Sequence, residues 1–164
     1  MGRAYDRLCE RFTELAHLAG AEELLTWDQQ TYLPPKGHRR RAGQLAALAA
    51  LVHRRLADPQ VGAWCAEAEG EGLEPAARRN LALMAWRHRR AAALPESLAA
   101  ALAEASAAAF EAWRAAREAD DFGRFAPHLE RVVALARERG RCLAGGGDPY
   151  AGLLEEYEPG LTPE

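Results

Sequence analysis

Residues 25–35 have the sequence Leu-Thr-Trp-Asp-Gln-Gln-Thr-Tyr-Leu-Pro-Pro, and this stretch contains the strongest helix stop in the chain. Proline has no amide hydrogen to donate, and the residue before a proline avoids helical dihedral angles. A helix that begins at Ala21 and reaches about Thr31 must therefore end by Leu33. The next helical pattern begins after the two prolines, at about His38. The stretch thus predicts two helices joined by a turn.

The same helical periodicity extends outward from this stretch in both directions. Apolar residues recur at intervals of three and four almost everywhere, and no segment alternates for long enough to indicate a half-buried strand. We therefore expect an all-α fold, a helical bundle of about seven to eight helices with short loops that forms a single helical domain over residues 1–164. Gly20 either ends the first helix or only weakens it. The predicted helices begin at about Arg3, Ala21, His38, Pro59, Glu74, Pro95, Asp121 and Pro149.

Short local signals mark several of these helix starts. In Asp58-Pro59 and Asp148-Pro149 the aspartate is typical of an N-cap, and proline is favoured at the first helical position. Asp120-Asp121 caps a later helix, in which Pro127 fits only if it lies in a first turn. We therefore expect a short turn to precede that helix.

Composition and charge exclude several classes of protein. Hydrophobic residues make up 49% of the 164 residues and charged residues 27%, and no apolar run approaches the roughly 20 residues that cross a bilayer. The net charge of -3 disfavours nucleic-acid partners, which usually meet a basic surface. The amino terminus has no apolar segment of the secretory type, so we expect a cytoplasmic protein without a membrane partner. The three cysteines, odd in number and far apart, predict neither a disulfide framework nor a zinc ribbon.

The histidines do not follow the pattern of a zinc peptidase. Such an enzyme places histidines at positions i and i+4 of a helix, with a glutamate after the first, so that both imidazoles face the metal. No two of the five histidines are four residues apart, and none is followed by glutamate. Glu14 and His17 match half of a di-iron motif, but the second copy that such a site needs is absent from the sequence. We therefore predict no catalytic residue, no cofactor-binding residue and no metal ligand in this chain.

Arg39, Arg40 and Arg41 stand at the start of a predicted helix, where the positive end of the helix dipole opposes a positive charge. Such a placement costs about 0.3–1 kcal/mol per residue near the terminus. An anion site or a set of ion pairs with acidic neighbours would compensate for this cost. The leading interpretation is nevertheless a solvated charged turn.

Four segments of the chain carry longer motifs in a fixed order. Residues 27–35 have the pattern Trp-Asp-Gln-x-Thr-x-x-Pro-Pro, and residues 41–48 have Arg-x-x-Gln-Leu-x-x-Leu. Residues 113–129 contain Trp-Arg and then Asp-Phe-x-x-Phe-x-Pro-His-Leu, and residues 149–160 have Pro-Tyr-x-x-Leu-Leu-x-x-Tyr-Glu-Pro-Gly. Together the four segments resemble the carboxypeptidase Taq family of metallocarboxypeptidases. Four collinear matches are hard to obtain by chance.

The resemblance implies a part of a longer enzyme. Members of that family are homodimeric, mainly helical enzymes that use a metal ion, usually zinc or cobalt, to remove residues from the carboxyl terminus of peptides. The resemblance covers this chain but only the amino-terminal third or so of a family member, and the family's His-Glu-x-x-His ligands lie downstream of it. We therefore expect a truncated, catalytically inactive region that forms a wall of the substrate groove and self-associates through a dimer contact. The alternative is a stand-alone helical interaction module that binds peptides or a full-length carboxypeptidase.

The resemblance singles out Trp27, Asp28, Gln29, Thr31 and Arg41 as candidate residues. In one interpretation this polar set faces the substrate groove. In the other interpretation the set is structural: Asp28 and Thr31 satisfy backbone groups around the proline turn, and Trp27 packs inside. The structural interpretation is the one we favour.

Overall fold

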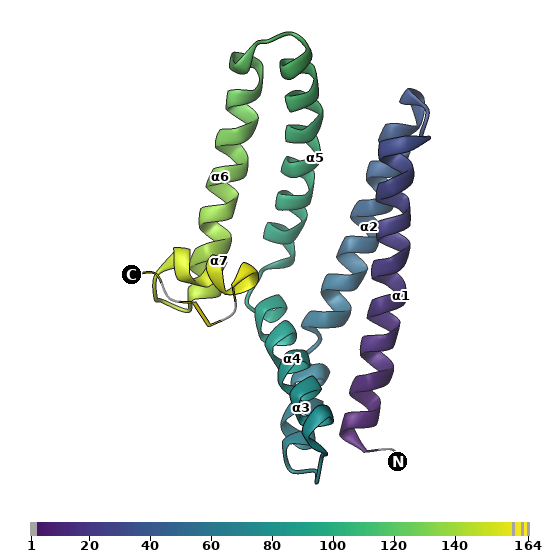
Figure 1. Cartoon of the computed structure of the whole chain (residues 1–164), viewed down its shortest axis with the longest axis vertical. Helices are drawn as coiled ribbons and strands as arrows, with labels where there is room; N and C mark the ends of the chain where they lie inside the picture. Colours follow the sequence, from purple (N-terminus) through teal and green to yellow (C-terminus); the bar gives the residue numbers. More distant parts are fainter. Residues whose placement is uncertain (1–2, 159, 162, 164) are drawn as a thin grey trace. The chain divides into compact units, whose positions relative to one another are not determined.

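The computed structural model describes residues 3–158, 160–161 and 163, and Figure 1 shows its path. Pro159, which belongs to the fourth motif, lies outside the described residues. No strand occurs among the described residues, so the all-α prediction is confirmed. Their helices are α1 (Ala4–Thr31), the 3-10 helix η1 (Pro35–Gly37), α2 (His38–Ala57), α3 (Pro59–Glu69), α4 (Pro75–Ala92), α5 (Glu96–Glu118), α6 (Phe122–Ala144) and α7 (Pro149–Tyr157).

These helices divide into two compact units. The first unit contains α1 to α4 and ends at Ala92, and the second contains α5 to α7 and begins at Ala93. A single domain over residues 1–164 stays a prediction. Among the described residues, no helix is both long enough and apolar enough to cross a membrane.

Helix α1 continues through Gly20 without a break. It spans 28 residues and merges the two helices that the sequence predicts on either side of this glycine. A Cβ atom added at Gly20 would meet no atom within 4 Å, so no close contact requires a glycine here. Gly20 therefore only weakens α1, by about 1 kcal/mol relative to alanine.

The N-caps predicted at the two Asp-Pro pairs are confirmed. Asp58 Oδ1 accepts a hydrogen bond from Gln60 N at 2.9 Å, and Asp148 Oδ1 accepts one from Tyr150 N at 3.0 Å. In each case the proline that follows the aspartate is the first residue of its helix. These two helix starts are therefore determined by local chemistry.

Pro127 departs from the prediction, because it lies inside α6. This helix begins at Phe122, directly after its N-cap Asp121, so Pro127 is its sixth residue and does not lie in a first turn. The missing amide of Pro127 would have bonded the carbonyl of residue 123, so a single helical hydrogen bond is lost in the second turn. That loss is small enough for a helix of 23 residues to continue past the proline.

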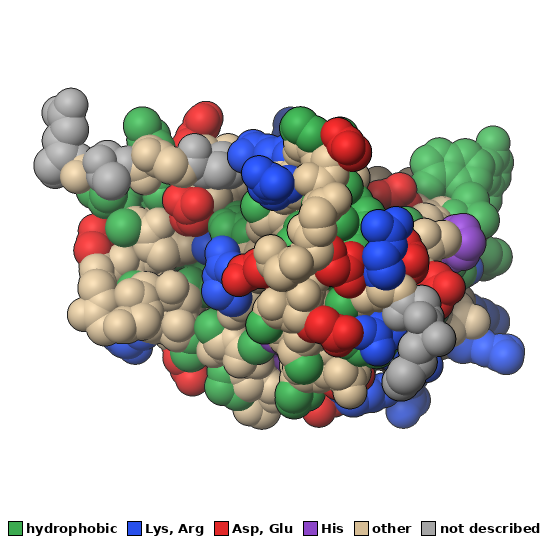
Figure 2. All heavy atoms as spheres, turned by 90° about the horizontal axis from the view of Figure 1, so that it is seen from below, with side chains coloured by type: hydrophobic (Ala, Val, Ile, Leu, Met, Phe, Trp, Pro, Cys, Tyr) green, Lys and Arg blue, Asp and Glu red, His purple; other side chains and the backbone are tan. Residues whose placement is uncertain are grey.

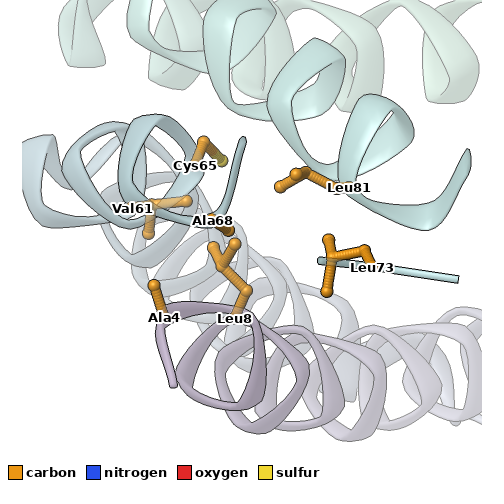
Figure 3. Packing of buried hydrophobic residues seen from close by; sticks show 7 residues of the cluster. All are labelled: Ala4, Leu8, Val61, Cys65, Ala68, Leu73 and Leu81. Atoms are coloured by element: carbon orange, nitrogen blue, oxygen red, sulfur yellow. The ribbon is translucent and has the colours of Figure 1, made fainter. Parts of the chain in front are cut away.

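The hydrophobic core of the first unit is formed by side chains from three helices and a loop. Leu8 of α1 and Val61 of α3 are its fully buried large residues. Burial raises the pKa of the Cys65 thiol, so Cys65 packs as a small neutral side chain. Figure 3 shows the cluster, which consists of Ala4, Leu8, Val61, Cys65, Ala68, Leu73 and Leu81.

An arginine pair packs against Trp64 beside this core. The guanidinium groups of Arg7 and Arg11 lie 5.6 and 5.5 Å from the centroid of the Trp64 ring. Arg11 also donates to Asp58 Oδ2 at 3.2 Å. The hydrogen bond from Gln60 N, together with that from Arg11, lowers the pKa of Asp58 although partial burial opposes the shift. The contact between α1 and the start of α3 is therefore partly ionic.

In the second unit, α5 and α6 form an antiparallel hairpin, and α7 packs against α6 (Figure 1). The α6–α7 contact brings backbone close to backbone. A Cβ atom added at Gly140 would lie 2.7 Å from the Pro149 carbonyl oxygen, and one added at Gly152 would lie 2.9 Å from Ala144 N. Glycine is therefore required at both positions by the space available.

Candidate functional site at the junction of α1 and α2

The first two helices are joined by a short reversal of the chain. Tyr32 N and Leu33 N both donate to the carbonyl oxygen of Asp28 at 3.0 Å, which ends α1. Gly37 N then donates to Pro34 O at 2.7 Å within η1, and α2 begins at the next residue. This reversal brings the carboxyl-terminal end of α1 beside the amino-terminal end of α2, as Figure 1 shows. The helix stop predicted from the two prolines is confirmed.

Arg41 links the two helices across this reversal. Its Nη2 lies 2.6 Å from Asp28 Oδ2, and its Nη1 donates to the Leu25 carbonyl oxygen at 2.6 Å. Its Nε donates to Gln44 Oε1 at 3.0 Å. The Arg41 side chain is only 12% exposed and that of Asp28 is 35% exposed. Hydrogen bonds to charged partners each contribute about 1.5–3 kcal/mol, so this junction is a substantial local restraint.

The neighbouring arginines behave differently from Arg41. Arg39 and Arg40 are exposed, in agreement with a solvated charged turn. Arg41 instead forms an ion pair, which was the alternative interpretation of the cluster. Its positive charge lies beside the carboxyl-terminal end of α1, whose carbonyl groups carry partial negative charge and offset the unfavourable dipole of α2.

Two details of the structural interpretation are wrong. The side chain of Asp28 pairs with Arg41 instead of capping backbone groups around the prolines. Trp27 does not pack inside: it is 52% exposed and meets Tyr32 edge-on, with ring centroids 5.5 Å apart. Its neighbours Leu25 and Gln29 are partly buried. Trp27 is two residues from each of them, and residues two apart lie on nearly opposite sides of a helix, so Trp27 points away from the covered side.

Thr31 and Gln29 complete the set. Thr31 Oγ1 donates to the Trp27 carbonyl oxygen at 2.8 Å, one turn back along α1, so this hydroxyl does satisfy a backbone group. The side chain of Gln29 points inward, and its Oε1 is buried without a hydrogen-bond partner among the described residues. Of the five candidates, the structure therefore links Asp28 directly to Arg41, whereas Trp27 lies on the outer surface of α1.

An open hollow follows the outer surface of α1 beside Trp27. Two glutamates line it together with the exposed face of the indole. Its full lining is Ala19, Glu22, Glu23, Thr26, Trp27 and Gln30. Such a shallow surface can contact an extended chain, but it encloses no reacting group.

Gln44 and Tyr32 were not among the sequence candidates. For Gln44 a signal was available, because residues three apart on a helix are neighbours and Arg41 precedes it by three. No sequence signal shows that Tyr32 packs on Trp27, since that contact depends on how α1 ends.

The described residues do not form a metal site. No group of three or more histidine, cysteine, aspartate or glutamate side chains gathers among them. Glu14, which belongs to the half di-iron motif, is held in ion pairs by Arg11 at 3.5 Å and Arg55 at 3.1 Å, and His17 is exposed. These donors do not fit a zinc or cobalt centre.

The face shown in Figure 2 carries no continuous stripe of basic side chains among the residues drawn in colour. On that face, acidic and basic side chains are intermingled among the residues drawn in colour. This agrees with the net charge of -3.

Comparisons with known proteins extend this picture. The family model of carboxypeptidase Taq (M32) metallopeptidase matches residues 7–164. Thermostable carboxypeptidase 1 of Thermus thermophilus is 42% identical over 171 residues, which cover 96% of this chain and 34% of that protein. Thermostable carboxypeptidase 1 of Pyrococcus furiosus is 28% identical over 94% of this chain and 31% of its own length. The chain thus spans about a third of the length of the curated relatives it matches.

Solved structures give the same result. Trypanosoma cruzi metallocarboxypeptidase 1 is similar with a TM-score of 0.82 and 33% identity, over 97% of this chain and 32% of that one. The M32 carboxypeptidase from Deinococcus radiodurans R1 has a TM-score of 0.80 and 31% identity, over the same two shares. The similarity therefore extends over nearly all of this chain and about a third of each of these structures.

Proposed function

Because this chain belongs to the carboxypeptidase Taq (M32) metallopeptidase family, we propose that it supplies the amino-terminal helical part of a metal-dependent carboxypeptidase and is catalytically inactive alone. The observation that carries the proposal is the 42% identity over 96% of this chain, matched by only 34% of the Thermus thermophilus protein. The missing His-Glu-x-x-His pattern supports the second part of the proposal, since a peptidase of this kind needs it to hold its metal.

The α1–α2 junction would then contribute to one wall of the substrate groove. In this proposal Asp28 and Arg41 are positioning residues, which hold the end of α1 by the contacts of 2.6 Å described above. Trp27 and the hollow beside it form the surface that an extended peptide would contact, because an exposed indole offers a large apolar face.

A peptidase assay tests the proposed inactivity. The purified chain is incubated with a set of peptides and added zinc or cobalt, and the release of carboxyl-terminal residues is followed by mass spectrometry. Thermostable carboxypeptidase 1 of Thermus thermophilus, assayed in parallel, shows that the conditions support the reaction. We expect no release by the chain alone above a blank. Release that a chelator abolishes would overturn the proposal.

Self-association is a separate part of the proposal. Large apolar side chains of both units are exposed outside the hollow beside Trp27, among them Leu24, Leu83 and Phe110. Apolar surface of this kind favours association. We expect light scattering to give a dimer or a larger species, and a monomer at high concentration would contradict this.

A further inference from the structure

One face of α6 carries apolar or small residues at the spacing of a coiled-coil seam. Successive members are separated by four, three, four, three and four residues, which keeps them on one narrow stripe of a helix. We call this stripe the α6 seam. It consists of Phe122, Ala126, Leu129, Val133, Ala136 and Gly140.

The two ends of the seam differ in what covers them. At the carboxyl-terminal end Gly140 is buried, and α7 packs so closely that an added Cβ atom would lie 2.7 Å from Pro149 O. Towards the amino-terminal end, Phe122 is 67% exposed, and Leu129 and Val133 are each 37% exposed. The seam is therefore a face that already binds one helix, and that helix covers only part of it.

We propose that the open part of the α6 seam, formed by Phe122, Leu129 and Val133, is the docking surface for a helix of the M32 peptidase body. By this body we mean the two thirds of the relatives' length that have no counterpart in this chain. The proposal rests on the proposed function, and it names the partner that would complete the enzyme.

Two observations support this occupant. First, α7 is itself a helix seated on the seam, so the same stripe continues as a helix-binding surface beyond the place where α7 covers it. Second, the match covers 96% of this chain but only 34% of the Thermus thermophilus relative, so about two thirds of that protein lies outside the match. Family members therefore have further chain available to cover this face.

The charges beside the seam favour one orientation of a docking helix. Glu130 and Arg137 follow the seam residues Leu129 and Ala136 directly, and both are exposed. They occupy the positions that flank a coiled-coil seam, where charge decides the orientation of the partner helix. A docking helix with a basic residue near Glu130 and an acidic residue near Arg137 would match this order.

Co-expression tests the proposal. The complete chain is produced together with a tagged form of thermostable carboxypeptidase 1 of Thermus thermophilus from which the matched region has been deleted. We expect the two polypeptides to co-purify. In Val133→Glu and Leu129→Glu, recovery of the chain should fall by about tenfold or more, because each places an unpaired carboxylate in an apolar contact.

The matched control is Ala134→Glu. Ala134 is an exposed neighbour of Val133 on α6 but lies off the seam, so the substitution adds the same charge without touching the docking surface. Recovery of this variant should equal that of the unmodified chain. Circular dichroism spectra and melting temperatures of all three variants establish that each is folded.

The outcomes separate this inference from the proposed function. If the unmodified chain co-purifies and the two seam variants do so equally well, the docking surface is wrong while the proposed function stands. If the unmodified chain does not co-purify, the docking proposal fails, and the activity assay on the chain alone still measures the proposed function. A dimer that Val133→Glu dissociates, and that does not bind the body, would assign the seam to a second copy and overturn the proposal.

Discussion

The two units of this chain pack their helices in different ways. In the first unit, large side chains fill the space between helices, and Leu8 and Val61 are completely buried. In the second unit Leu98 and Leu135 are also buried, but between α6 and α7 the helix backbones approach each other directly at Gly140 and Gly152. The core of the first unit is therefore stabilised by the volume of its apolar side chains, whereas the α6–α7 contact depends on the absence of a side chain at these two glycines.

This difference predicts opposite responses to substitution. Removing atoms should destabilise the first unit, because a buried cavity loses both burial and packing. Adding atoms at the α6–α7 contact should destabilise the second unit, because a new Cβ atom has no space at Gly140 or Gly152.

The largest effect is expected for Leu8→Ala in the first unit. This substitution removes a fully buried side chain, so the free energy of unfolding should fall by about 2–5 kcal/mol. Urea denaturation followed by circular dichroism measures the change, and hydrogen exchange should locate it in α1 to α4. The control is Leu24→Ala on the same helix, where the side chain is 63% exposed and the change should stay within about 0.5 kcal/mol. Equal effects of the two variants would contradict the comparison.

Gly152→Ala should give the next largest effect, in the second unit. The added Cβ atom would lie 2.9 Å from Ala144 N and 3.0 Å from the Gly140 carbonyl oxygen, so α7 must move away from α6. We expect a loss of about 1–3 kcal/mol, with faster hydrogen exchange in α7. Gly20→Ala is the matched control, because its Cβ atom has free space and should stabilise α1 by about 0.5–1 kcal/mol. Equal stability of Gly152→Ala and the unmodified chain would show that α7 is not tightly packed.

A double-mutant cycle on Asp28 and Arg41 measures how much the ionic junction of α1 and α2 adds to the stability that the apolar core gives the first unit. Asp28→Asn and Arg41→Gln should each lower the unfolding free energy by about 1–2 kcal/mol, and together by less than the sum, because both remove one ion pair. Urea denaturation provides the four values. Arg40→Gln, at an exposed neighbouring position, should change stability by less than about 0.5 kcal/mol. If the two losses of unfolding free energy add exactly in the double variant, Asp28 and Arg41 do not stabilise the junction through each other.

The smallest effect is expected in the acid stability of the first unit. The pKa of Asp58 is lowered from its ordinary value near 3.8, first by the hydrogen bond from Gln60 and also by Arg11. Its contribution is therefore fully present above that ordinary value and is lost as the pH falls through the lowered one. Asp58→Asn retains a cap but cannot titrate, so its stability should decline less steeply below about pH 4. Denaturation midpoints at several pH values measure this, and identical profiles would refute it.

The sequence predicted most helix boundaries because they depend on neighbouring residues. Pro34 and Pro35 stop a helix wherever they occur, and Asp58-Pro59 starts one by a hydrogen bond that spans two residues. The exceptions have the same origin. Gly20 and Pro127 are unfavourable in a helix by amounts that long helices tolerate. Gly20 follows the weaker of its two predicted outcomes, whereas the prediction that Pro127 lies in a first turn was wrong.

The candidate site was predicted as a set of residues but not as an arrangement. The motif resemblance placed Asp28 and Arg41 in the same list, and the structure adds that they form one ion pair between two helices. It also places Trp27 on the outer surface, which the motif could not indicate. A sequence motif indicates which residues matter. Whether a side chain points outward depends on which face of its helix is covered by other helices.

The amino-acid sequence by itself determined the all-α class, the stop at the two prolines and the aspartate caps of the two Asp-Pro pairs, because backbone hydrogen bonding and proline geometry act over a few residues. Tertiary structure alone decided the partner of Arg41, the exposure of Trp27 and the need for glycine at positions 140 and 152. These features depend on how closely consecutive helices approach each other and on which faces they turn together, and the packing of whole helix faces decides both.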